Sequence, residues 1–227
     1  KATNGISGLS LEGWTYGEEA KMPVATAQFG APTFTYSATA DGTFTETVPT
    51  AAGSYFVKAT VAATANYDGA EKTVEFKIGR ANAALTTIPT AVANLVYTGG
   101  ALDLITAGVA DGGTMQYKLG GNGTWSSDIP TAINAGEYTV YYKVLGDDNH
   151  SDIAEENITV GIAKAASTFG KLPQALDLSY TGAEQALLIA GETTCGEIWY
   201  KLGDGEWANE IPTATEAKTY YVYYKIV

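Results

Sequence analysis

An internal repeat of about 82 residues constrains this chain more than any other feature of its sequence. The tetrapeptide Ile-Pro-Thr-Ala begins at Ile129 and again at Ile211, 82 residues further along. Three more blocks recur in the same order with an offset of 82 or 83: YTVYYKV at 138–144 as YYVYYKI at 220–226, LVYTG at 95–99 as LSYTG at 178–182, and YKLG at 117–120 again at 200–203. This period indicates one domain per copy, because propeller blades repeat at about half this length.

A more diverged copy comes first in the chain. Val48-Pro49-Thr50-Ala51 matches the segment 129–132, and Ala52-Gly53-Ser54-Tyr55 matches the segment 135–138. A basic residue followed by alanine marks each junction, at Arg80 and at Lys164. We therefore predict three domains, over residues 1–80, 81–164 and 165–227.

The two ends of the chain lead us to expect a longer parent protein. The chain opens with Lys1-Ala2, which resembles the end of an earlier repeat. The third copy stops at Val227, just after the segment that matches 138–144, so we expect it to lack its last strand. Either the chain was cut at this position, or a neighbouring subunit supplies the strand to the open sheet edge.

Short segments rich in Val, Ile, Thr and Tyr alternate in polarity within each copy, and clusters of Gly, Asn and Asp separate them. This pattern is typical of strands and turns. In the second copy it predicts strands over 114–119, 124–129, 137–145 and 156–162, with a turn at 120–123. No segment has helical periodicity. We predict an all-β chain of three tandem immunoglobulin-like Greek-key β-sandwich domains, the third without its last strand.

The pattern Ala-Gly-x-Tyr-x-Val ends at Val57 in the first copy and at Val140 in the second. It resembles the tyrosine corner of immunoglobulin-type domains. Lys218 replaces the glycine in the third copy, so we expect a distorted corner or another backbone conformation there. The period of two along the strand that follows assigns Tyr138, Val140, Tyr142 and Val144 to the core and turns Tyr141 and Lys143 to solvent, an arrangement that Tyr223 and Lys225 repeat.

Charge and cysteine content limit the partners and the environment. The net charge of −12 and the pI of about 4.4 argue against nucleic acid or an anionic membrane surface as partners, because like charges repel. No apolar run is long enough to span a membrane, so we expect no membrane insertion in this segment. The one cysteine, Cys195, cannot form an intrachain disulfide, and we expect it to be buried as a small apolar residue.

Taken together, these blocks resemble the tandem Ig-like repeats of large bacterial surface proteins, the group often labelled MBG or YDG domains. The blocks that carry the resemblance are Leu-x-Tyr-Thr-Gly, Trp-x-x-x-Ile-Pro-Thr, Ala-Gly-x-Tyr-x-Val-x-Tyr-Lys-Val and Gly-Asp-Asp-Asn-His, and all of them lie within residues 95–164. The resemblance implies an extracellular or cell-surface location in a bacterium and an adhesive or spacer role. It carries no catalytic residues over to this chain.

Few residues are suited to catalysis or to metal binding. His150 is the one histidine, and we interpret it as a solvated loop residue, so we expect no enzyme, no catalytic residue and no cofactor. The surrounding turn, Asp147 to Asp152, offers oxygen ligands of the kind that calcium takes, but it lacks the glycine and glutamate of the helical calcium loop, and we assign no metal to it.

Aromatic residues are the one candidate for ligand binding. Trp125 and Trp207 occupy equivalent positions in two copies, which favours a role as cross-strand core or staple residues over a sugar-binding platform. Trp199 is particular to the third copy, where Gln116 is its counterpart in the second, and is therefore the best single candidate for a surface contact.

Two functions remain open from the sequence. The first is a semi-rigid stalk or spacer, since no Gly/Ser-rich or Pro-rich hinge interrupts the junctions at Arg80 and Lys164. The second is a module that binds a host glycan or an extracellular protein, either by itself or appended to a secreted polysaccharide-degrading enzyme. In both cases the neighbouring repeats of the parent chain are partners as well.

Overall fold

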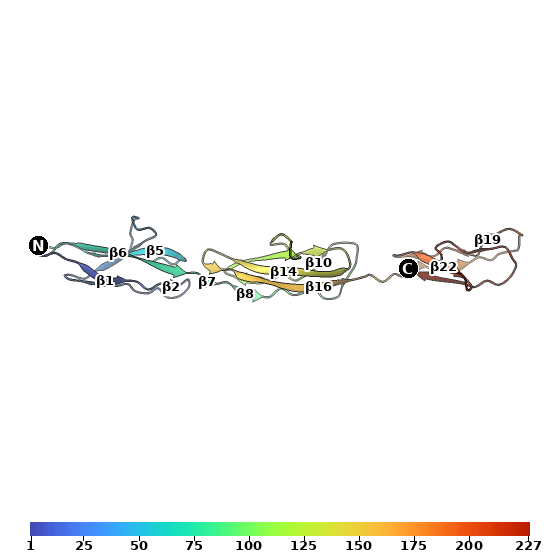
Figure 1. Cartoon of the computed structure of the whole chain (residues 1–227), viewed down its shortest axis with the longest axis horizontal. Coiled ribbons are helices and arrows are strands. Elements are labelled where there is room, and N and C mark those ends of the chain that lie inside the picture. The colour runs from blue at the N-terminus through green and yellow to red at the C-terminus, as the bar shows by residue number, and fades with distance from the viewer. The chain divides into compact units, whose positions relative to one another are not determined.

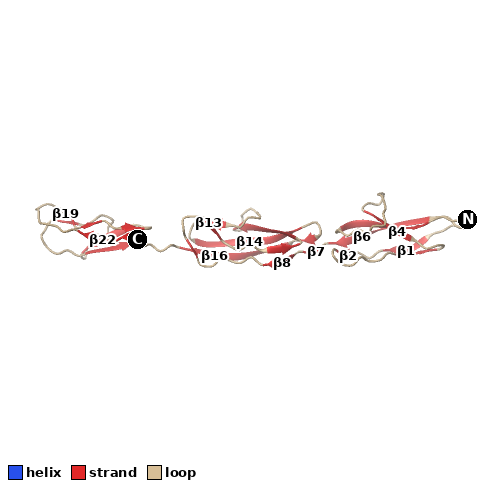
Figure 2. Cartoon of the chain, turned by 180° about the vertical axis from the view of Figure 1, so that it is seen from behind, coloured by secondary structure: helices blue, strands red, loops and turns tan.

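The computed structural model describes residues 1–227 and consists of strands, turns and loops, with no helix (Figure 2). The all-β prediction is therefore confirmed, and the several sheets, most of whose strand pairs are antiparallel, are consistent with a β-sandwich. The structure contains no helix with the length and apolar character needed to span a bilayer. The chain divides into two compact units, residues 1–163 and 164–227. We refer to residues 1–80, 81–164 and 165–227 as repeat 1, repeat 2 and repeat 3.

Repeat 1 is built around a four-stranded sheet with the order β2-β6-β5-β4. Its strands are β1 Ile6–Ser10, β2 Trp14–Thr15, β3 Val24–Ala27, β4 Thr33–Ser37, β5 Gly53–Val61 and β6 Ala70–Gly79. β5 alternates between apolar and polar residues, so Val57, Ala59 and Val61 fall on one face and are buried. Val57 and Ala59 pack in a core with Trp14, whose ring is stacked on Phe76.

Repeat 2 has the same arrangement around the sheet β12-β14-β16-β9. Its strands are β7 Ala81–Asn82, β8 Ala84–Thr87, β9 Leu95–Val96, β10 Leu102–Asp103, β11 Val109–Asp111, β12 Gly113–Leu119, β13 Thr131–Ala132, β14 Gly136–Gly146, β15 His150–Ser151 and β16 Ile153–Ala163. β14 and β16 lie side by side as the two longest strands of the chain (Figure 1). A separate core surrounds Leu104 and Val140, so repeats 1 and 2 each have an interior of their own.

The strand predicted over 124–129 is wrong in its length. Only Ser126 pairs with the neighbouring strand, through a two-way backbone hydrogen bond with Tyr117 (2.7 and 2.9 Å). The same single bridge recurs between Tyr36 and Thr45 and between Tyr200 and Ala208. After β12, the Gly123 N–H donates to the Gly120 carbonyl (3.2 Å) and Gly120 has a φ of +69°, so residues 120–123 form a tight turn, and pairing resumes only at Ser126.

Repeat 3 forms only small sheets. Its strands are β17 Phe169–Lys171, β18 Gln174–Ala175, β19 Gln185–Ala186, β20 Leu188–Ile189, β21 Glu192–Thr193, β22 Ile198–Leu202, β23 Thr213–Ala214 and β24 Val222–Ile226. β22 and β24 match β12 and β14 of repeat 2, but β24 pairs with β22 alone. No strand corresponds to β16, as the sequence predicts, and the only buried apolar residues there are Leu188 and Tyr200, which are 6% and 4% exposed.

The predicted core face of β14 is confirmed. Val140, Tyr142 and Val144 are buried, and Tyr138 is half-buried at the corner. Burial raises the pKa of Tyr142, and the nearby Glu156 carboxylate raises it further. The two residues expected in solvent, Tyr141 and Lys143, do lie on the opposite face of the strand, but both are only partly exposed.

A tyrosine corner is present in all three repeats. The hydroxyl of Tyr138 donates to the Asn134 carbonyl (2.7 Å), that of Tyr55 to Ala51 (3.1 Å) and that of Tyr220 to Glu216 (2.9 Å). Of the two alternatives expected for the third corner, a distorted corner and another backbone conformation, the second holds, because the hydrogen bond is intact. Lys218 takes no positive φ, so repeat 3 closes the same hydrogen bond with another backbone conformation.

Cys195 is exposed, which corrects the expectation that it is buried. Cys195 lies in the loop before β22, and its sulfur is 3.5 Å from the Ser167 hydroxyl. Alternation places residues on a face only within a strand, and Cys195 precedes the strand by three residues.

Candidate functional site

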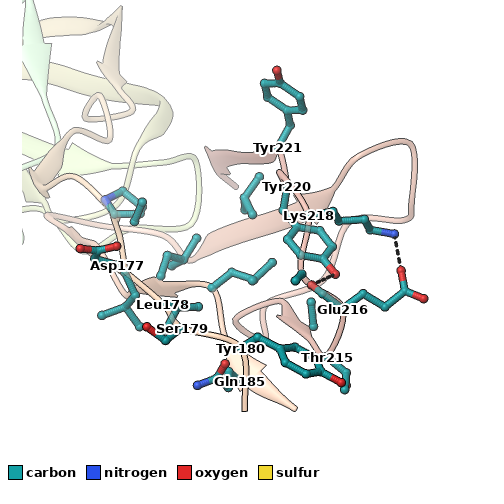
Figure 3. A pocket seen from close by; sticks show the side chains of 18 of the residues that line it. Asp177, Leu178, Ser179, Tyr180, Gln185, Thr215, Glu216, Lys218, Tyr220 and Tyr221 are labelled. Carbon is teal, nitrogen blue, oxygen red and sulfur yellow. Dashed lines mark hydrogen bonds and ion pairs between the residues drawn. The ribbon is translucent and has the colours of Figure 1, made fainter. Parts of the chain in front are cut away.

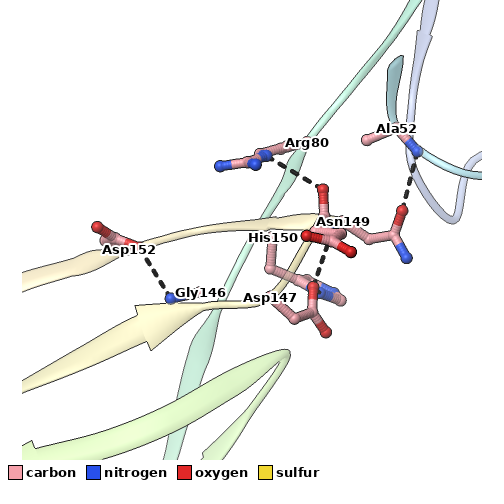
Figure 4. A network of polar contacts seen from close by, with 8 residues as sticks. Ala52, Arg80, Gly146, Asp147, Asn149, His150 and Asp152 are labelled. Carbon is pink, nitrogen blue, oxygen red and sulfur yellow. Dashed lines mark hydrogen bonds and ion pairs between the residues drawn. The ribbon is translucent and has the colours of Figure 1, made fainter.

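The acidic turn Asp147 to Asp152, between β14 and β16, is held by its own carboxylates (Figure 4). Asp147 Oδ1 accepts the Asn149 backbone N–H (2.8 Å) and lies 2.7 Å from His150 Nδ1. Asp152 Oδ1 accepts the Gly146 backbone N–H (2.8 Å). Short polar side chains that accept nearby backbone donors favour a defined turn. The turn is therefore rigid enough to present Asn149 and His150 in fixed positions.

Three residues of this turn contact repeat 1 or the residue that joins the two repeats. Asn149 Oδ1 accepts the backbone N–H of Ala52, 97 residues away (2.9 Å). The Nε of Arg80 donates to the Asp148 carbonyl (3.1 Å). The His150 ring lies edge-on to Tyr16, with ring centroids 5.2 Å apart and planes at 78°. Figure 4 shows the two hydrogen bonds across the junction.

The backbone at the junction is also held. β6 ends at Gly79 and β7 begins at Ala81, so Arg80 alone separates a strand of repeat 1 from a strand of repeat 2. β7 pairs in parallel with β15, and Ala81 N–H donates to the Asn149 carbonyl (2.9 Å). The one linking residue is therefore fixed on both sides by strand pairing and by its own side chain.

His150 is not the solvated loop residue that the sequence indicated. Only 19% of its side chain is exposed. Its ring lies against Gly112, where φ is +74° and a Cβ atom would overlap the ring. Because Gly112 has no side chain, the His150 ring can pack against its backbone. Tyr16 of repeat 1 also contacts the ring. The sequence signal that could have identified this contact is weak, because it is spread over three distant segments.

Electrostatics in the turn favour an ionised Asp147. Hydrogen bonds from His150 and from the Asn149 backbone lower the pKa of Asp147 below its ordinary value, since both stabilise the carboxylate form. The structure contains no group of three or more His, Cys, Asp or Glu side chains placed to hold a metal ion. In the turn, Asp147 and Asp152 each use an oxygen on a backbone donor, so the structure assigns these carboxylates a role in shaping the turn.

The tryptophans at repeated positions lie across the outer face of each strand pair. The Trp125 ring is covered by Lys118 (4.6 Å) and Lys143 (4.5 Å), and Trp207 by Lys201 (5.6 Å) and Lys225 (4.5 Å), measured from each Nζ to the ring centroid. Both rings are half-buried. Each lysine pair comes from two neighbouring strands, so the ring joins them as a cross-strand staple through cation–π contacts.

Trp199 lies on the same outer face of repeat 3. It is half-buried in β22, its register partner in β24 is Lys225, and alternation places it on the face of Lys201. Tyr223, which contacts Lys201 (5.1 Å from Nζ to the ring centroid), is 53% exposed on this face. Repeat 3 therefore has a wider aromatic surface than repeat 2, where Gln116 replaces the tryptophan.

Repeat 3 also contains a groove of about 720 Å³ along the open side of β24 (Figure 3). Val222 and Tyr224 line one wall, and Leu178 and Tyr180 line the other. At one end, Lys218 forms an ion pair with Glu216 (2.9 Å), which lowers the pKa of the glutamate and raises that of the lysine. The sequence predicted the open edge but not this groove.

No family model matches the chain, and no curated protein matches it.

Proposed function

We propose that this chain is a non-catalytic segment of a bacterial cell-surface or secreted protein, in which three immunoglobulin-like repeats of the MBG or YDG type serve as a stalk and as an adhesion module. One observation carries the stalk role: a single residue, Arg80, joins repeats 1 and 2, and the turn of repeat 2 contacts repeat 1 on both sides of it. The family resemblance of the sequence blocks supports the location.

The contacts at this junction oppose bending. One residue spans only about 3.5 Å, so it cannot move two domains apart by extending. Swinging repeat 2 away from repeat 1 breaks the Asn149–Ala52 hydrogen bond, which contributes about 0.5–1.5 kcal/mol, and exposes the Tyr16–His150 ring pair. The parallel pairing of β7 with β15 keeps the turn next to the linker during any such motion.

Rotational diffusion measured by NMR relaxation of the full chain tests the stalk role. We expect the amides of repeats 1 and 2 to fit one common diffusion tensor. The triple variant Tyr16→Ala, Arg80→Ala, Asn149→Ala is expected to need two diffusion tensors. The control Lys21→Ala breaks only an exposed ion pair of 4.0 Å and is expected to leave the single tensor unchanged. Independent tumbling of the two repeats in the unmodified chain would refute the stalk role at this junction.

The cellular location needs a separate test. Antibodies raised against this chain are expected to label intact, unpermeabilised bacteria that produce the parent protein, or to detect it in the culture medium. Labelling that requires permeabilisation would contradict the proposed surface or secreted location.

A second candidate function is binding of a glycan or an extracellular protein by the aromatic face of repeat 3. The observation that favours it is the cluster of Trp199, Trp207 and Tyr223 on one face. Glycan arrays and mucin pull-downs with the full chain test it, with Trp199→Ala as the variant and Gln116→Ala, at the matched position of repeat 2, as the control. Loss of retention in Trp199→Ala alone would support this function, and absence of retention by the unmodified chain would remove it.

A further inference from the structure

In repeats 1 and 2 the chain enters and leaves through two segments that run in the same direction. In repeat 2, residues 81–97 lie parallel to residues 149–163 and pair with them at both ends, through β7 with β15 and through β9 with the end of β16. In repeat 1, residues 2–16 pair in the same way with residues 66–79, through Ala2 with Tyr67 and through β2 with the end of β6. The other strand pairs of these two repeats are antiparallel. We call the two parallel arrangements the terminal pairs.

Backbone hydrogen bonds hold the terminal pair of repeat 2 at both of its ends. At the start, the Ala81 N–H donates to the Asn149 carbonyl (2.9 Å), and at the end the Tyr97 N–H donates to the Ala163 carbonyl (2.9 Å). β9 is the outermost strand of its sheet, and β16 is its one strand partner there. The entering segment is therefore attached to this sheet only through the last strand of the repeat.

The terminal pair of repeat 1 has hydrogen bonds at the equivalent places. The Ala2 N–H donates to the Asn66 carbonyl (2.8 Å), and the Tyr16 N–H donates to the Gly79 carbonyl (2.8 Å). β2 is likewise the outermost strand of its sheet. Repeat 1 is the more diverged copy in sequence, yet it keeps this arrangement. The terminal pair therefore belongs to the fold of the repeat and not to one sequence block.

Buried side chains shield the terminal pairs from water. In repeat 1, Trp14 of β2 and Ile78 of β6 are register partners, and they are 7% and 0% exposed. In repeat 2, Ile162 of β16 is 3% exposed, and its register partner Leu95 packs against the same core. Hydrogen bonds in such an environment of low dielectric constant are stronger than in water. We therefore expect the bonds of the terminal pairs to resist stretching.

A pull on the two ends of the chain loads each terminal pair in shear. In repeat 2 the entering segment begins at Ala81, and the last strand ends at Ala163, at the opposite end of the repeat (Figure 1). Since the two segments are parallel, the pull draws them in opposite directions along their common axis. The hydrogen bonds between them are then strained together, whereas an antiparallel hairpin pulled at its two open ends loses its bonds one after another.

We propose that the terminal pairs of repeats 1 and 2 resist unfolding of these repeats under tension, so that the chain carries a tensile load along its length. The interior of a repeat is not released until its terminal pair has separated, so this separation determines the unfolding rate under force. The inference goes beyond the stalk role and does not depend on it, because bending at the junction and pulling within a repeat break different contacts.

Constant-force measurements on single molecules of the chain, held by handles at the two termini, test the proposal. Unfolding of repeat 1 or of repeat 2 releases about 80 residues and lengthens the molecule by about 25 nm. Tyr97→Pro removes the N–H that donates to Ala163, and proline is tolerated in the outermost strand of a sheet. We expect repeat 2 of this variant to unfold about two- to twelvefold faster at a given force, while repeat 1 of the same molecule keeps its rate.

Ser126→Pro is the matched control in repeat 2. It removes the N–H that donates to the Tyr117 carbonyl (2.9 Å), a backbone hydrogen bond outside the terminal pair. Urea unfolding is expected to show a similar loss of stability in both proline variants, since each loses one backbone hydrogen bond. Under force, however, the Ser126 bond is still intact when the terminal pair separates. Its loss therefore affects the folded state and the transition state equally, and the unfolding rate is expected to stay unchanged.

The direction of the pull gives a test that leaves both hydrogen bonds in place. One handle is attached to Asn122→Cys, in the loop after β12, and the other to the C-terminus, with Cys195→Ser removing the exposed native thiol. β12 and β16 flank β14, so this pull separates neighbouring strands from one end. We expect repeat 2 to unfold at a markedly lower force than when the chain is pulled by its two termini, because the bonds break in succession.

Several results would overturn the proposal. It is wrong if repeat 2 unfolds at the same force in both pulling directions. It is wrong as well if Tyr97→Pro, shown by NMR to be folded, unfolds under force at the rate of the parent chain, or if Ser126→Pro accelerates forced unfolding as much as Tyr97→Pro does. Independent tumbling of repeats 1 and 2 in the NMR relaxation experiment would refute the stalk role at the junction and leave these outcomes unchanged.

Discussion

The hydrogen bond from the Ala52 amide to Asn149 Oδ1 allows a direct test of the junction. At 2.9 Å it joins a half-buried donor in repeat 1 to an acceptor in the turn of repeat 2. Asn149→Ala removes the acceptor without removing the Asp147 contacts that shape the turn. A net contribution of about 0.5–1.5 kcal/mol corresponds to a two- to twelvefold faster exchange of the Ala52 amide, since about 1.4 kcal/mol is a factor of ten.

Hydrogen exchange followed by NMR on the full chain measures this rate. The Val57 amide, in the centre of β5, serves as the internal reference, because it reports opening of repeat 1 as a whole. Asn122→Ala, in the exposed loop after β12, is the matched control and is expected to leave Ala52 unchanged. An Ala52 amide that exchanges equally fast in the parent chain and in Asn149→Ala would refute the junction contact. Equal acceleration at Val57 would assign the effect to global destabilisation instead.

Three further predictions concern stability and pH. Val140→Ala removes two methyl groups from a completely buried side chain, and urea unfolding is expected to show that it destabilises repeat 2 by about 2 kcal/mol. The matched variant Val222→Ala, at the open groove, is expected to lower the stability of repeat 3 by markedly less. Tyr117→Phe removes the hydroxyl that accepts the Gly108 N–H (2.8 Å) and is expected to lower the stability of repeat 2 by about 1–3 kcal/mol. The matched variant Tyr200→Phe removes a longer hydrogen bond, from the Gly191 N–H (3.3 Å), and is expected to destabilise repeat 3 less. The pKa of Asp147 is lower in the folded chain than in the unfolded chain. The stabilisation by its carboxylate is therefore complete above the unfolded pKa of about 4 and is lost as the pH falls through the folded pKa. NMR titrations that follow the chemical shift of the Asn149 amide are expected to report this loss.

Each of these has an outcome that contradicts it. Equal destabilisation by Val140→Ala and Val222→Ala would show that β24 is as well covered as β14. A Tyr117→Phe variant as stable as the parent would show that water satisfies the Gly108 amide. If Asp147→Asn keeps the acid transition of the Asn149 amide, another carboxyl group is responsible for it.

Local sequence patterns predicted the three longest strands of repeat 2, which are β12, β14 and β16. The alternation in residues 137–145 predicted both the strand β14 and its buried face, because side-chain direction within a strand follows the period of two. The Ala-Gly-x-Tyr pattern predicted the tyrosine corner, whose hydrogen bond spans only four residues. For the third corner the sequence left two alternatives open, a distorted corner and another backbone conformation, and the second holds because the Tyr220 hydroxyl needs only the Glu216 carbonyl and no glycine at position 218.

Contacts between distant segments could not be predicted in this way. The sequence showed His150 as the lone histidine of an acidic turn, but Tyr16 and Gly112, which bury it, lie in other loops. The sequence identified Trp199 as a candidate for a surface contact, but its position beside Lys225 follows only from the register of β22 with β24.

The sequence by itself determined that the chain is an all-β protein built from repeated units, since hydrophobic alternation and turn residues act over a few neighbouring positions. Only the tertiary structure decided that Asn149 contacts Ala52 and that Leu178 and Tyr224 form opposite walls of one groove. Such contacts depend on how strands from remote parts of the chain pack together, and no local pattern encodes that packing.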